Sequence, residues 1–391
     1  MALDANCSLF QRCALKIGGA AVETSGNLLH RTSFVRRMLG WDAAAASQQG
    51  KAEGMGYHAP VVFPTDETTY APTGCGAIST DTRMFIATDP GSTGAAIDAQ
   101  PNPAFSQSYW DRASLIHNGR TVVIRTPLSA LTAFVKPGMP AIQCTSLELE
   151  VQPTDPNQLL VKASGAPDGY IKVLDMTLLL KVVQPRADVA AELLESATEK
   201  RTSIYQWLAA ETSLQNVTSQ AITFNGSISG NPQWLVASFL PSHFLTDGQL
   251  YPFFCSIPPN GIISNPPVAS ARVNIGGVSF PSISYGSLGG ILDLSRMYNA
   301  YLDMANQVST TGGGAFLSYE EWQTNCFLLC FDLRNRPASA PLGASPGQSY
   351  TLEIILRQQP SAQWTLYSTT FGITSVQMSF SATSGVTLIP M

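Results

Sequence analysis

The chain has 391 residues, of which 13% are charged and 45% are hydrophobic, and its formal net charge is −5. A typical globular domain has about 25% charged residues, so a surface with this composition is prone to associate with other protein. The nearly balanced charges form no polybasic stretch that could neutralise many phosphates. We therefore expect self-association and no direct binding to nucleic acid.

Residues 1–80 are predicted to form an extended N-terminal arm, because Gly, Ala and Pro interrupt the candidate elements there. Within it, only residues 28–41 could hold a short helix. Asp4, Arg12 and Lys16 break up the start of the chain, so it has no continuous apolar run typical of a secretory signal. No stretch approaches the roughly 18 apolar residues of a membrane span, and we expect a soluble protein.

From about residue 81, short apolar or alternating runs are separated by Pro, Gly, Asn and Asp, which is typical of a β-sandwich or barrel. Apolar and polar side chains alternate along residues 350–357, so one face of that strand should be buried. Residues 327–333 are apolar on both faces, which predicts a strand covered from both sides. Further strands are expected at residues 120–125, 144–151 and 170–183.

Two helices are predicted within the β-rich part. The first covers residues 189–211, with Asp188 as its N-cap and apolar residues at helical spacing. The second covers residues 292–308, which are rich in Leu, Met and Tyr at a spacing of three to four. The chain therefore consists of two blocks of strands, each with one helical insertion, and the break at Gly230-Asn231-Pro232 is their predicted boundary.

The residues that could carry chemistry form no recognisable site. The four histidines lie far apart, and no Cys/His cluster has metal-ligand spacing, so neither a metal nor a cofactor is expected. The seven cysteines are odd in number and widely spread, which predicts buried thiols in a reducing compartment.

Two patterns that resemble enzyme motifs have simpler interpretations. Residues 343–347 match Gly-x-Ser-x-Gly, but Pro346 lacks the backbone N–H that would help form an oxyanion hole. Glu148 and Glu150 would lie about 6.6 Å apart on one face of a strand, within the range of a glycosidase pair. A glycosidase cleft usually adds Trp and Tyr near its acids, whereas the nearest Trp in the sequence, Trp110, is about 40 residues away. The solvated face of an edge strand is therefore the favoured interpretation. We predict that the chain is not an enzyme.

The order of several segments resembles the hexon-like major capsid proteins of Polinton-type elements, adintoviruses and virophages, which are relatives of the adenovirus hexon. Residues 110–131 contain Asn118 and Gly119 ahead of a strand, and residues 170–197 join a valine-rich strand to a helix. Phe331, Asp332 and Leu333 stand where the family has Phe-Asp-Leu before a loop. The acidic and proline residues usual after this motif are replaced here by Arg334 and Asn335.

This resemblance implies an all-β double jelly-roll of a DNA virus, with two upright eight-stranded sandwiches, short helical insertions and an N-terminal arm. The implied division is an arm at 1–80, a first jelly-roll at 81–232 and a second at 233–391. Three copies would form a pseudo-hexagonal capsomer of an icosahedral shell. Phe331, Asp332, Leu333, Asn118 and Gly119 would be structural motif residues.

The resemblance also implies partners and a location. The chain would contact itself within the trimer and the capsid lattice, and would contact other capsid proteins such as penton or cement proteins. It would be found in the virion after assembly in the host cytoplasm or nucleus. Two alternatives remain open: a minor or vertex protein of penton type with a single jelly-roll, and a carbohydrate-binding or hydrolytic β-sandwich protein.

Overall fold

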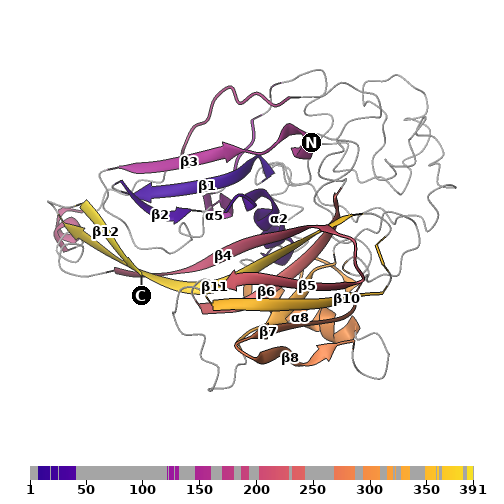
Figure 1. Cartoon of the computed structure of the whole chain (residues 1–391). Coiled ribbons are helices and arrows are strands. Elements are labelled where there is room, and N and C mark those ends of the chain that lie inside the picture. Colours follow the sequence, from indigo (N-terminus) through magenta and orange to yellow (C-terminus); the bar gives the residue numbers. More distant parts are fainter. Residues whose placement is uncertain are drawn as a thin grey trace.

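The computed structural model of the chain is mostly β-strand with few helices, as the all-β prediction requires (Figure 1). The statements below concern the residues that it describes. These are residues 8–17, 19–24, 26–40, 121, 123–126, 128–131, 146–159, 170–179, 186–192, 202–228, 231–242, 268–286, 294–308, 315–319, 322, 327–334, 348–357, 359–360, 363–381 and 385–390.

The N-terminal part of the chain contributes to a three-stranded antiparallel sheet with the order β2-β1-β3. Its strands are β1 (Phe10–Ile17), β2 (Ala20–Thr24) and β3 (Leu147–Pro153). On β1, Cys13, Leu15 and Ile17 are buried, while the charged Arg12 is exposed. An extended arm was predicted here, and this prediction is wrong for the described residues 8–40, because their apolar side chains find partners in β3 and in helix α2.

Helix α2 (Leu29–Gly40) lies between this sheet and a larger β-sandwich (Figure 1). It confirms the helix predicted at residues 28–41. Phe34, Val35, Met38 and Leu39 belong to the main core of the protein. The Tyr301 hydroxyl donates a hydrogen bond to the Met38 carbonyl over 3.0 Å, so the helix is fixed to the sandwich by a polar contact as well. Two single-turn helices, α5 (Leu128–Leu131) and α6 (Pro156–Leu159), flank β3.

The sandwich consists of two antiparallel sheets. The four-stranded sheet has the order β5-β10-β7-β8, and the five-stranded sheet has the order β12-β11-β6-β9 with β4 also paired to β11. The strands of the first are β5 (Ala221–Ile228), β7 (Val268–Ile275), β8 (Val278–Tyr285) and β10 (Gln348–Leu356). Those of the second are β4 (Thr202–Val217), β6 (Asn231–Pro241), β9 (Leu329–Asp332), β11 (Trp364–Ser381) and β12 (Gly385–Pro390).

Successive strands of the sandwich alternate between its two sheets. The chain passes from β4 to β5, β6 and β7 by changing sheet each time, and only the hairpins β7–β8 and β11–β12 stay within one sheet. Neighbours such as β5 and β10 are far apart in sequence. Such wrapping is typical of Greek-key and jelly-roll sandwiches rather than of a simple meander.

The apolar core lies between the two sheets and is closed on one side by α8 (Leu294–Val308). On β10, Tyr350, Leu352, Ile354 and Leu356 are all at most 1% exposed, which confirms the alternation predicted for residues 350–357. Residues 327–331 and Leu333 are completely buried, which confirms the prediction of a strand covered on both sides. Helix α8 confirms the helix predicted at residues 292–308.

A hydrogen bond joins the two sheets through the core. The Tyr350 hydroxyl on β10 donates to Ser368 Oγ on β11 over 2.8 Å. The ring of Tyr350 fits here only because Gly226 is its cross-strand partner on β5. A Cβ atom at position 226 would lie 2.2 Å from Cζ of this ring.

Three local predictions are wrong. Of the helix predicted at 189–211, the described residues 189–192 are helical, but residues from Thr202 onward form β4. Its residues 202–207 are rich in β-branched and aromatic side chains, which favour strands, and long pairing with β11 fixes them as one. The described residues of 120–125 and 170–183 form no strand. A strand needs a hydrogen-bonded neighbour, which the side-chain pattern of one segment cannot predict. The strand predicted at 144–151 is confirmed by β3.

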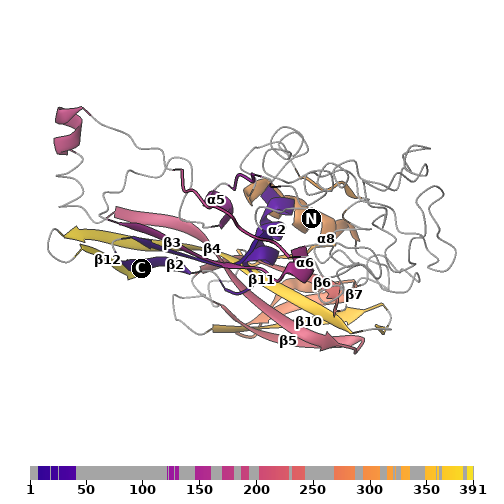
Figure 2. The ribbon, with the colours of Figure 1, turned by 90° about the horizontal axis from the view of Figure 1, so that it is seen from above.

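The predicted division at residue 232 also needs correction. That residue lies inside β6, and strands on both sides of it share both sheets of the sandwich. We propose that the boundary lies before β4, so that residues 202–390 form one unit. The N-terminal part of the chain contacts this unit in two places. Helix α2 packs against α8. Strand β2 contacts β12, and these two strands lie together at one end of the molecule (Figures 1 and 2).

We predict that Gly226→Ala destabilises the sandwich by about 1–3 kcal/mol, as overpacking of a core usually does. The Tyr350 ring is buried and held by Ser368, so it cannot move away from the added methyl group. Thermal unfolding followed by circular dichroism measures the effect. Ser227→Ala on the same strand is the control, because its side chain is exposed, and it should change stability by less than about 0.5 kcal/mol. Equal melting temperatures for the two variants would contradict this packing.

We also predict that stability falls as the pH drops from about 6.5 to about 4, partly because of His30. Burial, together with the smaller effect of the neighbouring Arg31, lowers the pKa of His30 from 6.5 to about 4, while a hydrogen bond with Gln158 of α6 opposes the shift. The unfolded chain therefore binds the proton more tightly. The stabilisation is complete above the unfolded pKa and is lost as the pH falls through the folded one.

The loss should be on the order of 3 kcal/mol. Urea denaturation between pH 7 and pH 4 measures it. His30→Gln carries no titrating group and should show a flatter pH dependence over this range. If both proteins lose the same stability between these pH values, His30 is not responsible.

Candidate functional site

The motif residues Phe331, Asp332 and Leu333 lie at the end of β9, at the edge of the five-stranded sheet. Asn118 and Gly119 lie outside the described residues. The alternation of the strand separates the motif into two kinds of side chain. Phe331 and Leu333 point into the core and are fully buried, whereas Asp332 is half-buried.

The two apolar motif residues fix β9 against both sheets. The Phe331 ring lies 5.6 Å from the ring of Tyr285, which ends β8 in the opposite sheet. The Tyr285 hydroxyl donates to the carbonyl of Cys330 over 3.1 Å. On the other side, Leu333 N donates to Gln233 O over 2.9 Å and extends the pairing of β9 with β6 beyond the last strand residue.

Asp332 binds the arginine that follows the motif. Its carboxylate accepts hydrogen bonds from Arg334 N and Nε, both at 2.9 Å, and from a terminal guanidinium nitrogen at 2.8 Å. The hydrogen bond with Asp332 raises the pKa of Arg334 against the opposing effect of burial. Bidentate pairing of this kind is short and geometrically specific. The chain bends at Arg334, directly after β9.

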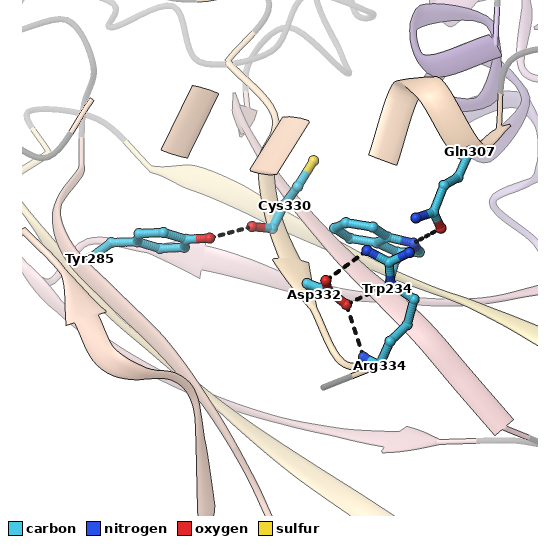
Figure 3. A network of polar contacts seen from close by, with 6 residues as sticks. All are labelled: Trp234, Tyr285, Gln307, Cys330, Asp332 and Arg334. Carbon is cyan, nitrogen blue, oxygen red and sulfur yellow. Dashed lines mark hydrogen bonds and ion pairs between the residues drawn. The ribbon is translucent and has the colours of Figure 1, made fainter. Parts of the chain in front are cut away.

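The guanidinium of Arg334 also stacks on an aromatic ring. Its Cζ lies 4.6 Å from the centre of the Trp234 ring, which is a cation–π arrangement. Trp234 Nε1 in turn donates to Gln307 Oε1 on α8 over 3.0 Å. Figure 3 shows this chain of contacts from Asp332 through Arg334 and Trp234 to Gln307. It connects the end of β9, strand β6 and the last turn of α8.

Sequence reasoning found only part of this network. Arg334 departs from the family motif, and the sequence did not predict that it binds Asp332. The spacing of two residues between an Asp and an Arg was the available signal for this pair. Trp234 and Gln307 are distant in sequence and gave no signal of their proximity. The structural role of Phe331, Asp332 and Leu333 stays a prediction. The contacts described above specify it: these residues would hold the end of β9 in place.

Two of the acidic residues singled out in the sequence, Glu148 and Glu150, lie on β3. No group of three or more His, Cys, Asp or Glu residues that could hold a metal ion is found in the described part of the chain. Glu148 and Glu150 are exposed on β3, at the edge of the N-terminal sheet, and Lys16 donates a hydrogen bond to Glu150. This agrees with the solvated face of an edge strand.

Other residues considered from the sequence have ordinary surroundings or lie outside the described ranges. Cys13 and Cys330 are buried thiols, as predicted, and burial raises the pKa of Cys330, so that it stays protonated. The Gly-x-Ser-x-Gly segment at 343–347 is not described. Within the described ranges, no helix has the length and apolar character needed to cross a membrane.

Comparisons with solved structures show similarity to viral capsid proteins. The mavirus major capsid protein is 9% identical, with a TM-score of 0.43, and the match covers 100% of this chain and 78% of that one. For the Faustovirus major capsid protein the identity is 10%, the TM-score 0.46 and the coverage 97% and 73%. For PBCV-1 VP54, fitted into a reconstruction of the virophage Sputnik, the values are 10%, 0.45, 99% and 85%.

The mavirus and Faustovirus structures are those of major capsid proteins, the class that the order of segments in the sequence resembles. No protein-family model matches the chain, and no curated protein matches it.

We predict that Asp332 and Arg334 stabilise the end of β9 together. Replacing either by Ala should lower stability by about 1 kcal/mol, and a double-mutant cycle should give a coupling energy of roughly 0.5–1 kcal/mol. The matched control is the pair Arg186 and Asp188, which has the same spacing but is 84% and 62% exposed. Its cycle should give a coupling near zero. Equal coupling in both pairs would show that Trp234 and the surrounding strands add nothing.

Proposed function

We propose that this chain is a capsid structural protein that assembles with copies of itself into a viral shell. The observation that carries the proposal is the sandwich at residues 202–390, whose successive strands alternate between two antiparallel sheets. This wrapping is that of jelly-rolls, which are common in viral capsid proteins. The low charged fraction of 13% supports it, because lasting interfaces are depleted in charged residues.

The distribution of chemistry supports a structural role rather than catalysis. Asp332 is engaged by Arg334, and Glu353 on β10 is engaged by Arg272 and Asn274. Each of these carboxylates already accepts hydrogen bonds from a nearby guanidinium or amide group. Such groups hold strands in register and are poorly suited to act as general acids or bases.

For the assembly we propose a homotrimeric, pseudo-hexagonal capsomer of an icosahedral DNA-virus shell. A trimer presents six similar sides only if each chain contains two similar units. We assign the second unit to residues 202–390 and the first to residues before 202, which include the sheet β2-β1-β3. Contacts with penton or cement proteins and location in the virion belong to the same proposal.

A penton-type vertex protein with a single jelly-roll is the second candidate. It is favoured by one observation: among the described residues, the N-terminal unit has three strands, whereas the C-terminal unit has nine. A chain with one complete sandwich and a smaller attached sheet would suit five-fold symmetry equally well. The number of copies in the assembly separates the two candidates.

The test is the mass of the purified chain in solution, measured by analytical ultracentrifugation and followed by electron microscopy. We predict a trimer of three 41.8-kDa chains, about 125 kDa, seen as particles with a six-sided outline. A pentamer of the same chain would support the vertex candidate instead. A monomer over the whole range of protein concentrations would overturn the capsid proposal.

A further inference from the structure

A stretch of apolar side chains at residues 170–179 is exposed and belongs to no sheet among the described residues. At every second position, Leu174, Met176 and Leu178 are 63%, 57% and 40% exposed. Between them, Asp175 accepts a hydrogen bond from the Thr177 hydroxyl over 3.3 Å. These three side chains would share one face of a strand. The other face would carry Asp175 and Thr177 between Val173 and Leu179, which are 56% and 77% exposed. No described strand lies beside the segment.

The segment is attached to the sandwich at one point only among its described residues. Ile171 packs against the main core, whereas Tyr170 and the residues from Lys172 to Leu179 are exposed. Exposing several large apolar side chains together is unfavourable for an isolated protein and marks surfaces that contact other protein. The segment therefore has the properties of a strand that is completed by a partner.

An open edge of the same protein has the matching properties. Among the described strands, β5 is the outermost one of the four-stranded sheet and pairs only with β10. Its sequence, Ala221–Ile228, has neither a charged residue nor a proline. On its outer face Thr223, Asn225 and Ser227 are exposed, and on its inner face Ile222 and Phe224 are buried. Proteins usually protect such edges with charges, prolines or bulges, and β5 has none of the first two.

Two other edges of the described sheets suit this segment less well. The outer edge of β8 contains Pro281, which lacks an N–H, and the carbonyl of its Ile283 already accepts a hydrogen bond from Arg296. Strand β3 carries the exposed carboxylates of Glu148 and Glu150. Like charges would oppose a segment that contains Asp175. Of these three edges, β5 is the best suited to accept this segment.

We propose that residues 170–179 of one copy add as a strand to the β5 edge of a second copy. Ten residues in a strand span about 33 Å, enough to cover the eight residues of β5, which span about 26 Å. Leu174, Met176 and Leu178 would extend the apolar inner face of the sheet, beside Ile222 and Phe224. Asp175 and Thr177 would lie on its outer face beside neutral side chains. This inference rests on the proposed assembly and assigns one of its contacts.

The proposal is tested with two full-length variants that each lose one half of the contact. The edge variant, Ala221→Glu with Ser227→Glu, keeps the segment but places negative charges along β5, where they would repel Asp175 of an added segment. The segment variant, Leu174→Asp with Met176→Asp, keeps β5 but disrupts the apolar face. All four positions are exposed, so both variants should fold, which circular dichroism verifies. Ser282→Glu, an exposed position on the opposite edge of the same sheet, is the matched control.

Hydrogen exchange measured by mass spectrometry reads the result, because a strand added to a sheet protects its backbone amides. In assembled wild-type protein and in Ser282→Glu, peptides from 170–179 and 221–228 should exchange at least tenfold more slowly than in dilute monomer. In the edge variant alone, the 170–179 peptide should exchange rapidly. Adding the segment variant, whose own peptide has a different mass, should restore its protection.

The outcomes separate this inference from the proposed function. If the wild-type chain assembles while residues 170–179 exchange rapidly, the contact is wrong and the capsid proposal stands. Slow exchange of this peptide in the edge variant alone, or in dilute monomer, would show that it pairs elsewhere and would also overturn the contact. A chain that never assembles would overturn both, since this contact requires a second copy.

Discussion

Two antiparallel sheets cover each other's apolar faces, and the remaining structure depends on keeping them face to face. The hydrogen bond from Tyr350 to Ser368 and the contact of Tyr285 with Phe331 cross between the sheets inside the core. Neither contact can form unless β10 and β8 lie opposite β11 and β9. Because successive strands alternate between the sheets, most connections pass from one sheet to the other. We therefore propose that residues 202–390 form one unit, with no division at residue 232.

Helix α2 transmits this arrangement to the N-terminal sheet. Arg31, only 3% exposed, donates to Ser238 Oγ on β6 over 3.3 Å, and its guanidinium lies 5.0 Å from the centre of the Tyr367 ring on β11. A buried guanidinium is costly unless aromatic faces and hydrogen bonds replace its hydration. This requirement favours one position of α2 on the five-stranded sheet. The helix therefore fixes where β1 and β2 lie.

Features that depend on local side-chain periodicity were predicted correctly from the sequence. Features that depend on pairing between distant strands were not. The buried faces of residues 327–333 and 350–357 and the helix at 292–308 follow from side-chain alternation or helical spacing alone. Residues 202–211 have helical periodicity too, but the pairing of β4 with β11 overrides it. Likewise, Phe331, Asp332 and Leu333 were recognised as a motif, while the contact of Arg334 with Trp234 joins strands that only the fold brings together. Long-range pairing has no signature in a single sequence.

Several of the few charged residues of the chain form ion pairs within the sandwich. In the sandwich, Arg272 binds Glu353 across β7 and β10 at 2.6 Å, and Arg334 binds Asp332 at the end of β9. Each of these pairs neutralises charge locally. Strand β5 itself contains no charged residue. Burying a neutral edge against another chain costs far less desolvation than burying an unpaired charge. The same distribution that holds the strands in register therefore leaves an edge ready for contact with another copy.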